Sequence, residues 1–180
     1  MRVAIAAAIL LAIAPAELSG NSGELPASPP ASVRLIVDGK PTCWATPGQW
    51  GYWTARHCIQ SPTRGVVSGR GRLPFSADPR RDLAHVGAPD VSVPLGVASE
   101  GDVLYWRRAD GAHGSYVADG RDEDGLRICH LAGPDLVAGS SGTGLWLDSG
   151  HLVAILARYE RDPDTASCGA ERAAWAVEVP

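Results

Sequence analysis

Glycine and proline interrupt this chain so often that little room is left for regular helices. The 180 residues include 21 glycines and 14 prolines. Beyond the N-terminal region, no amphipathic segment long enough for a typical helix lies between two turn signals. The segments between the interruptions are short and rich in apolar and β-branched residues, which is typical of strands. Many short strands at close spacing predict an all-β barrel or sandwich.

The expected strands follow from these short runs. They are Val33–Val37, Thr42–Ala45, Gly51–Ala55, Gly65–Val67, Leu83–Val86, Asp102–Trp106, Ser115–Ala118, Leu126–His130, Leu145–Asp148, Leu152–Ala157 and Ala173–Val179. The second and third flank the turn signal Thr46-Pro47-Gly48-Gln49, which predicts a hairpin. Two prolines and a glycine interrupt the pattern within Pro89–Ser99, where we expect a boundary between two halves of the domain.

The composition and the first residues predict an exported globular domain. The chain is 45% hydrophobic and 20% charged, with a net charge of -4, which argues against nucleic acid as the main partner. Arg2 precedes an apolar run too short to span a bilayer, and Ala14-Pro15-Ala16 follows it, so we expect a signal peptide at residues 1–16. Residues 17–32, rich in Pro, Ser, Gly and Ala, are expected to form a flexible linker before a folded domain at 33–180.

Export makes disulfides the expected state of the four cysteines. Several pairings are possible in principle. We favour Cys43–Cys58 and Cys129–Cys168, because each pair then lies within one half of the chain. Zinc binding by Cys43, His57 and Cys58 is an alternative, but no paired Cys-x-x-Cys spacing supports it, and we expect no bound metal or organic cofactor.

The segment Gly139–Gly144 reads Gly-Ser-Ser-Gly-Thr-Gly and precedes two predicted strands. A serine between glycines can lie on a tight turn with its hydroxyl exposed and backbone N–H groups beside it. Acyl-transfer chemistry needs this combination of a nucleophile and preformed donors for an oxyanion. Such clusters are more often plain loops, so the weight of this motif depends on two upstream segments.

The first upstream segment is Thr54-Ala55-Arg56-His57-Cys58, in which a disulfide to Cys43 would fix the turn that presents the imidazole. The second enters the predicted strand Leu83–Val86 at Asp82. A partly buried carboxylate at that point needs a partner, and an imidazole N–H is a suitable one. Asp78 and Asp90 are competing carboxylates, whereas alternation along an extended segment turns His85 to the opposite face.

Together these three segments resemble the trypsin-like serine peptidases, in the compact form found in bacteria. Thr54–Cys58 is similar to their Thr-Ala-Ala-His-Cys segment, Asp82-Leu83-Ala84 to their Asp-Ile-Ala strand, and Gly139–Gly144 to their Gly-Asp-Ser-Gly-Gly-Pro loop. The chain order His, Asp, Ser agrees with the chymotrypsin type. The resemblance implies two six-stranded antiparallel β-barrels, at about 33–93 and 94–180, with the active site between them.

The resemblance also implies roles for individual residues. Ser141 would be the nucleophile, His57 the general base and Asp82 the residue that orients His57. The backbone N–H groups of Gly139 and Ser141 would form the oxyanion hole. Asp135 lies six residues before Ser141, where an acid at the base of the pocket would select substrates with Arg or Lys.

Some residues depart from the family pattern. Ser140 stands where zymogen-activated members have an aspartate that pairs with a newly cut N-terminus, and the segment after Ile155 lacks their Ser-Trp-Gly. We therefore expect a secreted or periplasmic monomeric endopeptidase that acts on proteins or peptides without binding nucleic acid or, after signal removal, a membrane. The alternative is a catalytically impaired secreted binding protein of the same fold; an esterase on an unrelated fold is less favoured.

Overall fold

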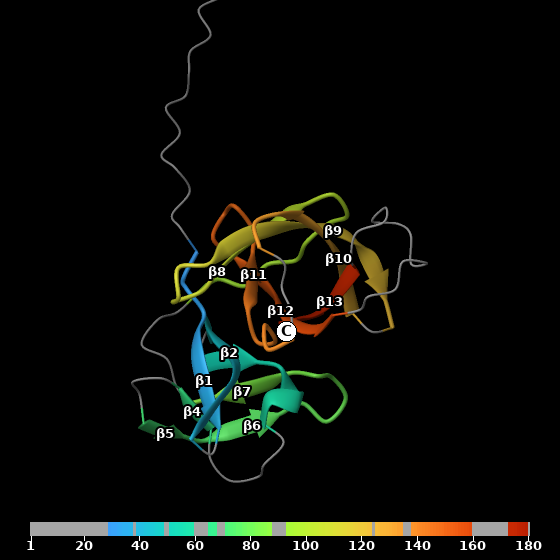
Figure 1. Cartoon of the computed structure of the whole chain (residues 1–180). Coiled ribbons are helices and arrows are strands. Elements are labelled where there is room, and N and C mark those ends of the chain that lie inside the picture. The colour runs from blue at the N-terminus through green and yellow to red at the C-terminus, as the bar shows by residue number, and fades with distance from the viewer. Residues whose placement is uncertain are drawn as a thin grey trace, which may run out of the picture.

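The computed structural model in Figure 1 is built almost entirely from short antiparallel strands. It describes residues 29–37, 39–48, 51–59, 65–67, 71–87, 93–123, 125–134, 138–159 and 173–179. Within these ranges the helical structure consists of one 3₁₀ turn, η1 (Arg56–Ile59), and no helix has the length and apolar character needed to cross a membrane. The prediction of an all-β chain is therefore confirmed.

The N-terminal half forms a seven-stranded sheet in the order β5-β4-β1-β2-β3-β7-β6. Its strands are β1 (Val33–Val37), β2 (Lys40–Gly48), β3 (Gly51–Thr54), β4 (Gly65–Val67), β5 (Gly71–Leu73), β6 (Phe75–Ala77) and β7 (Ala84–Val86). Strand β2 is central to this first unit, because it pairs with both β1 and β3. In Figure 1 the first unit is the blue and green lower half.

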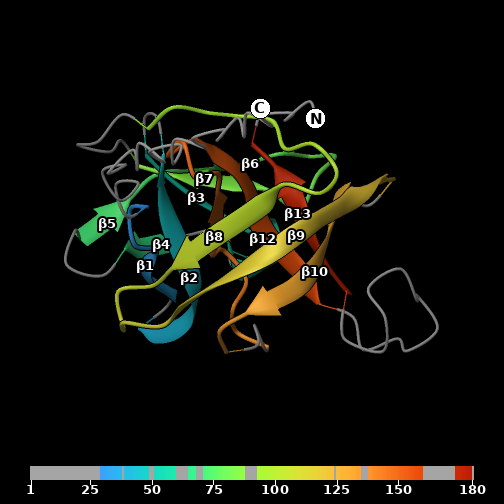
Figure 2. The same cartoon turned by 90° about the horizontal axis from the view of Figure 1, so that it is seen from above.

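The C-terminal half forms a closed barrel in the order β10-β13-β12-β11-β8-β9. Its strands are β8 (Val103–Arg107), β9 (His113–Asp122), β10 (Gly125–Ala132), β11 (Gly144–Trp146), β12 (Leu152–Tyr159) and β13 (Ala173–Glu178). Figure 2 looks down on this second unit and shows its strands tilted across one another. Tilted strands are what closure of a small barrel requires.

The two units share part of their hydrophobic core. One cluster of buried side chains fills the barrel around Leu104, Trp106 and Ile128. A second cluster joins Leu35 and Val86 of the first unit to Trp146, Leu152 and Ile155 of the second. Because barrel residues complete the core of the sheet, the two units are packed against each other rather than merely tethered.

Every predicted strand overlaps an observed one, and two observed strands were not predicted. The missed strands are β5 and β6, each only three residues long. Gly71 and Pro74, next to or within them, resemble turn residues, and tertiary pairing with β4 and β7 overrides that local signal. The predicted hairpin is present, but β2 continues to Gly48, which pairs with Gly51, so its turn is tighter than expected.

The predicted disulfide Cys43–Cys58 is confirmed. It joins β2 to η1 across 15 residues of sequence, with Cα atoms 6.0 Å apart. Cys129 is also disulfide-bonded, and its expected partner, Cys168, lies outside the described residues. The first bridge thus fixes the short turn that carries His57 to the central strand of its sheet.

This bridge should contribute measurably to stability. A cross-link that closes a loop of this length removes about 3 kcal/mol of conformational entropy from the unfolded chain. We expect the double variant Cys43→Ala/Cys58→Ala to lose about that much free energy of unfolding in urea denaturation, compared with oxidised wild-type protein. An unchanged midpoint and slope would contradict this account.

Candidate active site

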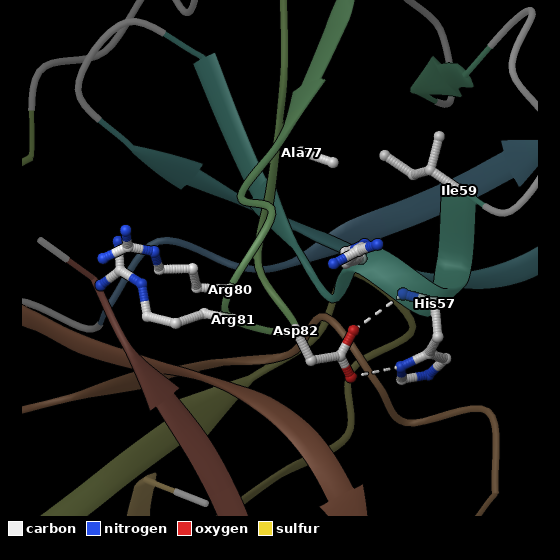
Figure 3. A pocket seen from close by; sticks show the side chains of 7 residues that line it. His57, Ile59, Ala77, Arg80, Arg81 and Asp82 are labelled. Atoms are coloured by element: carbon white, nitrogen blue, oxygen red, sulfur yellow. Dashed lines mark hydrogen bonds and ion pairs between the residues drawn. The ribbon is translucent and has the colours of Figure 1, made fainter.

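His57 and Asp82 meet at the edge of the first unit. His57 lies in η1, just after β3, and Asp82 lies just before β7, which pairs with β3. The Asp82 carboxylate accepts two hydrogen bonds from His57. Its Oδ1 bonds the backbone N–H at 2.8 Å, and its Oδ2 bonds the ring Nδ1 at 2.6 Å. Figure 3 shows both contacts. One carboxylate therefore fixes both the backbone and the ring of the histidine.

The turn before Asp82 is itself well ordered by hydrogen bonds. The Asp78 carboxylate accepts hydrogen bonds from the backbone N–H groups of Arg80 and Arg81 and forms an ion pair with the Arg81 side chain. The next residue after Asp82, Leu83, is buried in the core of the first unit. Asp82 is thus held between a capped turn and a buried side chain, which leaves its carboxylate at the edge of the sheet.

The contact shifts the pKa of both groups in directions that favour the ion pair. The hydrogen bond that the His57 ring donates to Asp82 raises the pKa of His57, although burial opposes the shift. Burial acts to raise the pKa of Asp82, but hydrogen bonds from the His57 side chain and backbone together hold it below its ordinary value. The pair therefore stabilises the fold between these two values. Its contribution fades as the pH falls through the lowered pKa of Asp82 or rises through the raised pKa of His57.

The loop that carries Ser141 is a tight turn pressed against the first unit. Gly139 and Gly142 both have a φ of 88°, a left-handed conformation that favours glycine. A side chain at Gly142 would collide with the Trp44 carbonyl oxygen, so only glycine fits there. The carbonyl of Ser141 accepts a 2.9 Å hydrogen bond from the Trp44 N–H. Ser141 is therefore tied to β2 through its backbone.

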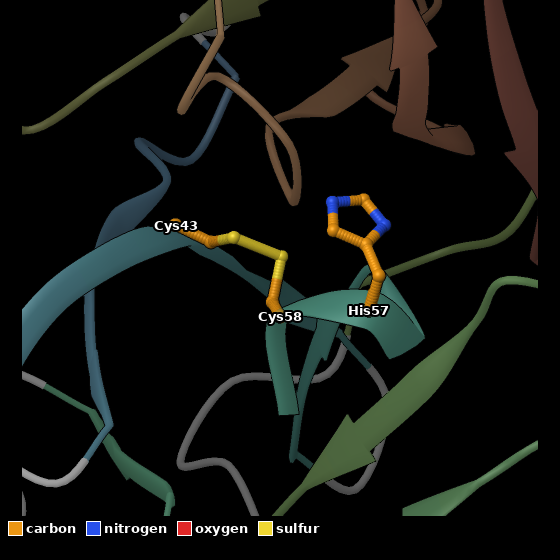
Figure 4. Close-up of side chains that lie close together, drawn as sticks. All are labelled: Cys43, His57 and Cys58. Atoms are coloured by element: carbon orange, nitrogen blue, oxygen red, sulfur yellow. A yellow bond between two sulfur atoms is a disulfide. The ribbon is translucent and has the colours of Figure 1, made fainter. Parts of the chain in front are cut away.

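This tie brings Ser141 to the same part of β2 as His57. Trp44 follows Cys43, Cys43 is bonded to Cys58, and Cys58 follows His57. A ring nitrogen of His57 lies within 4.8 Å of both sulfur atoms, and Figure 4 shows the imidazole beside the disulfide. Both sulfurs are used in this bond, so they are not available as the thiolate ligands that the zinc alternative requires.

The hydroxyl of Ser141 does not bond the imidazole of His57 in this structure. Among the described residues, Ser141 Oγ has one hydrogen bond, which it donates to the Ala157 carbonyl at 3.5 Å. The distance is long, and the hydroxyl of a half-buried serine can take another staggered χ1 rotamer. The side chain is thus oriented toward β12, although its backbone lies beside the histidine-bearing half.

The two backbone donors predicted for the oxyanion hole are unoccupied by protein acceptors. Within the described part of the chain, neither the Gly139 N–H nor the Ser141 N–H donates a hydrogen bond. The next N–H groups, of Gly142 and Thr143, do have acceptors, at Leu156 and Ser140. Two free N–H donors on a tight turn beside a serine hydroxyl are the kind of groups that bind an anionic oxygen.

A buried hydroxyl pair that the sequence did not reveal supports the same loop. Ser32 and Thr46 are fully buried, with their hydroxyls 2.7 Å apart. Thr46 donates to the Gly142 carbonyl at 2.8 Å, and Ser32 accepts from the Gly144 N–H at 3.2 Å. Ser32 ends the expected linker 17–32, so ordered contacts begin before Val33. The partners are too distant in sequence for any local pattern to indicate them.

Ser140, the neighbour of Ser141, faces the interior. It is 1% exposed, and its hydroxyl accepts a 3.4 Å hydrogen bond from the Arg108 guanidinium. That guanidinium lies over the rings of Trp44 and Trp106, at 4.8 and 5.3 Å from their centres. Burial makes Ser140 a poor nucleophile and leaves Ser141 as the accessible serine of the loop.

The other predicted residues lie elsewhere. Asp135 and the competing Asp90 are outside the described residues, so their roles stay predictions. Asp78 is engaged with Arg81 rather than with His57. His85 packs edge-on against Trp53, with ring centres 5.0 Å apart, as expected for a residue on the opposite face from Asp82.

Comparison with known proteins identifies the fold. Neither protein-family models nor curated protein sequences gave a match. Among solved structures, the chain is similar to a chymotrypsin of Cellulomonas bogoriensis, with a TM-score of 0.58 and 16% identity over 83% of this chain and 91% of that chain. It is also similar to a serine endoprotease of Yersinia pestis, with a TM-score of 0.61 and 16% identity over 83% of this chain and 59% of that longer one. The expected trypsin-like fold is thereby confirmed.

The His57–Asp82 contact predicts a specific titration. In wild-type protein we expect His57 to titrate above its ordinary pKa of about 6.5. In Asp82→Asn the neutral amide no longer attracts the imidazolium, while burial still disfavours it, so the pKa of His57 should fall. NMR titration of the ring protons measures both values.

The exposed Asp148→Asn serves as a control that removes one carboxylate elsewhere. A wild-type His57 that titrates at its ordinary value, or one unaffected by Asp82→Asn, would contradict the geometry described above.

The buried Ser32 network predicts an effect on stability. Ser32→Ala leaves the Thr46 hydroxyl and the Gly144 N–H with one partner fewer in a buried setting, which should cost about 1–3 kcal/mol of unfolding free energy. The same substitution at the exposed Ser76 should cost less than about 0.5 kcal/mol. If Ser32→Ala and Ser76→Ala lower the free energy of unfolding by the same amount in urea denaturation, the network does not stabilise the fold.

Proposed function

We propose that the chain is an exported serine endopeptidase that uses Ser141, His57 and Asp82 as a catalytic triad. The observation that carries the proposal is the paired contact of Asp82 with the ring and backbone of His57. The disulfide Cys43–Cys58 ties the turn that carries His57 to β2, the strand that also holds the Ser141 loop. The trypsin-like fold supports it, since this is the fold of the chymotrypsin and the endoprotease to which the chain is similar.

In the proposed reaction, Ser141 Oγ attacks the carbonyl carbon of a peptide bond while its proton passes to His57 Nε2. The Asp82 carboxylate holds the proton on Nδ1, so that Nε2 is the free acceptor, and it stabilises the imidazolium that forms. The oxygen that becomes negative lies against the N–H groups of Gly139 and Ser141. Each such donor typically contributes a factor of about 10²–10³ to the rate.

The tetrahedral intermediate then collapses to an acyl-enzyme. The C–N bond breaks, and the amine leaves with the proton that His57 Nε2 carries. A water molecule repeats the sequence: His57 accepts its proton, its oxygen attacks the ester, and Ser141 Oγ recovers the proton as the acid product leaves. No metal or organic cofactor takes part in the proposed steps.

The reaction requires the Ser141 side chain to change rotamer. Its hydroxyl must leave the Ala157 carbonyl and turn toward His57 Nε2. The bond to be broken is long, and catalytic hydrogen bonds in free enzymes often tighten only when substrate binds. Binding of the peptide would thus complete the triad.

The proposed substrate is a protein or peptide, and the proposed enzyme is a monomer that is secreted or periplasmic. The disulfide Cys43–Cys58 fits an oxidising compartment. The signal peptide at 1–16 and the preference for Arg or Lys through Asp135 stay predictions, because both lie outside the described residues.

A second candidate is a secreted binding protein that has kept the fold and lost catalysis. The observation in its favour is that the Ser141 hydroxyl bonds Ala157 rather than His57. The two candidates differ in one measurable property, which is the reactivity of Ser141.

A fluorophosphonate probe measures that reactivity directly. We expect it to label the mature wild-type protein covalently and to leave Ser141→Ala unlabelled, because the nucleophile is absent. His57→Ala should label more slowly by a factor of about 10²–10⁴, since the general base is lost.

The matched control is Ser140→Ala, which removes the neighbouring hydroxyl that faces Arg108 and should keep labelling. All variants are compared after circular dichroism has verified their fold. Labelling of Ser141→Ala would rule out Ser141 as the nucleophile. Failure to label folded wild-type protein would favour the binding protein.

A further inference from the structure

Two adjoining cavities beside His57 and Asp82 are lined by arginines. The first, of about 540 Å³, is bordered by Arg56, Arg80 and Arg81 together with His57 and Asp82. The second, of about 310 Å³, shares Arg80, Arg81 and Asp82 with the first and extends to Ala157. Ser141 lines neither cavity, but its hydroxyl bonds the carbonyl of Ala157, which is part of the second cavity's wall.

Two of the three arginines that border the first cavity are held by the protein. Arg56 donates to the carbonyl oxygens of Asp78 and Pro79, at 3.2 and 3.1 Å. Arg81 contacts the Asp78 carboxylate through Nε and a terminal nitrogen, at 2.7 and 2.6 Å. Within the described part of the chain, the exposed Arg80 side chain has no acceptor. Its guanidinium is therefore available to a ligand.

The acids around the cavities are mostly occupied. Asp82 is bound to His57, and Glu178 forms a 2.7 Å ion pair with Arg121. Glu123 is exposed in the turn between β9 and β10, and Arg158 adds a further cation to the second cavity. The first cavity has three arginines against the single carboxylate of Asp82. Arg81 is paired with Asp78, whereas Arg56 and Arg80 have no carboxylate partner among the described residues, so the wall beside the candidate catalytic pair is positively charged.

The position of Arg80 is set by the same turn that orders Asp82. The Asp78 carboxylate accepts a 2.8 Å hydrogen bond from the backbone N–H of Arg80. The backbone of Arg80 is therefore fixed, although its side chain is exposed. Figure 3 shows the Arg80 and Arg81 side chains running in the same direction, away from the Asp82–His57 contact. An arginine on a fixed turn loses less freedom on binding a carboxylate than one on a mobile loop.

We propose that Arg80, with Arg81 beside it, binds an acidic side chain of the peptide substrate within a few residues of the bond that Ser141 cleaves. The inference rests on the proposed function and names a substrate feature for it. A guanidinium matches a carboxylate with two parallel N–H donors, and such charge-assisted contacts are among the strongest at a partly exposed site. The acidic substrate residue that Arg80 would bind is a different residue from the Arg or Lys expected to contact Asp135.

Matched peptide pairs test the proposal. Fluorogenic peptides differ only by Glu or Gln at one position at a time, over about four residues on each side of the cleaved bond. At one or more of these positions we expect kcat/KM to be about tenfold higher for Glu than for Gln at low salt. The ratio should shrink toward one as the salt rises to about 1 M, because the contact is solvent-exposed and screened.

Variants assign the preference to its residue. In Arg80→Gln the Glu/Gln ratio should fall to about one, and in Arg80→Glu a Lys peptide should be preferred over its Glu counterpart. The control is Arg107→Gln, an exposed arginine at the end of β8 that borders neither cavity, and it should keep the wild-type ratio.

The outcomes separate this inference from the proposed function. If wild-type protein cleaves peptides with a ratio near one at every position, the inference is overturned while the peptidase assignment stands. A ratio that survives Arg80→Gln also overturns it. If folded wild-type protein cleaves no peptide and resists the fluorophosphonate probe, the proposed function fails, and the inference fails with it.

Discussion

The hydrogen bonds between strand β2 and the loop at 139–144 make one site out of two β-units. Trp44 donates from its backbone to Ser141, and Thr46 donates from its buried hydroxyl to Gly142. Trp44, Thr46 and Gly142 are buried, so water has little access to their hydrogen-bonding groups. The loop at 139–144 belongs to the barrel half of the chain, yet it is hydrogen-bonded to β2 of the sheet. A displacement of one unit against the other would therefore cost buried hydrogen bonds as well as packing.

The same strand also sets the position of the imidazole. Cys43 on β2 is bonded to Cys58, and the intervening chain returns through β3 to the turn that holds His57. Asp82 fixes this turn from the other side, because its carboxylate bonds both the backbone and the ring of His57. One strand thus serves as the common support for the hydroxyl and the base of the proposed triad. Rigid support of this kind is what catalysis by positioning requires, because small displacements of reacting groups lower rates steeply.

Much of the fold could be predicted from local sequence, whereas the supports of the site could not. Gly and Pro spacing predicted the strands well, because turn residues act through their own backbone preferences. It missed β5 and β6, whose pairing with neighbours outweighs Gly71 and Pro74. His57, Asp82 and Ser141 stood out because their segments resemble, in the same chain order, three segments of the trypsin-like serine peptidases. Ser32 was assigned to a linker, since its partner Gly144 is 112 residues away and local composition carries no trace of such a contact.

The anchoring of the nucleophile loop also explains how a serine can occupy position 140. In the zymogen-activated peptidases that the sequence resembles, an aspartate at this point pairs with a newly cut N-terminus. Here the Ser140 hydroxyl accepts a hydrogen bond from the Arg108 guanidinium, which lies over two tryptophan rings. The hydroxyls of Thr46 and Ser32 bond Gly142 and Gly144 of the same loop. Ser32 is itself held by backbone hydrogen bonds to Arg107 and Ala109. The loop is therefore held by hydrogen bonds and ring contacts to groups of the folded domain, in addition to packing.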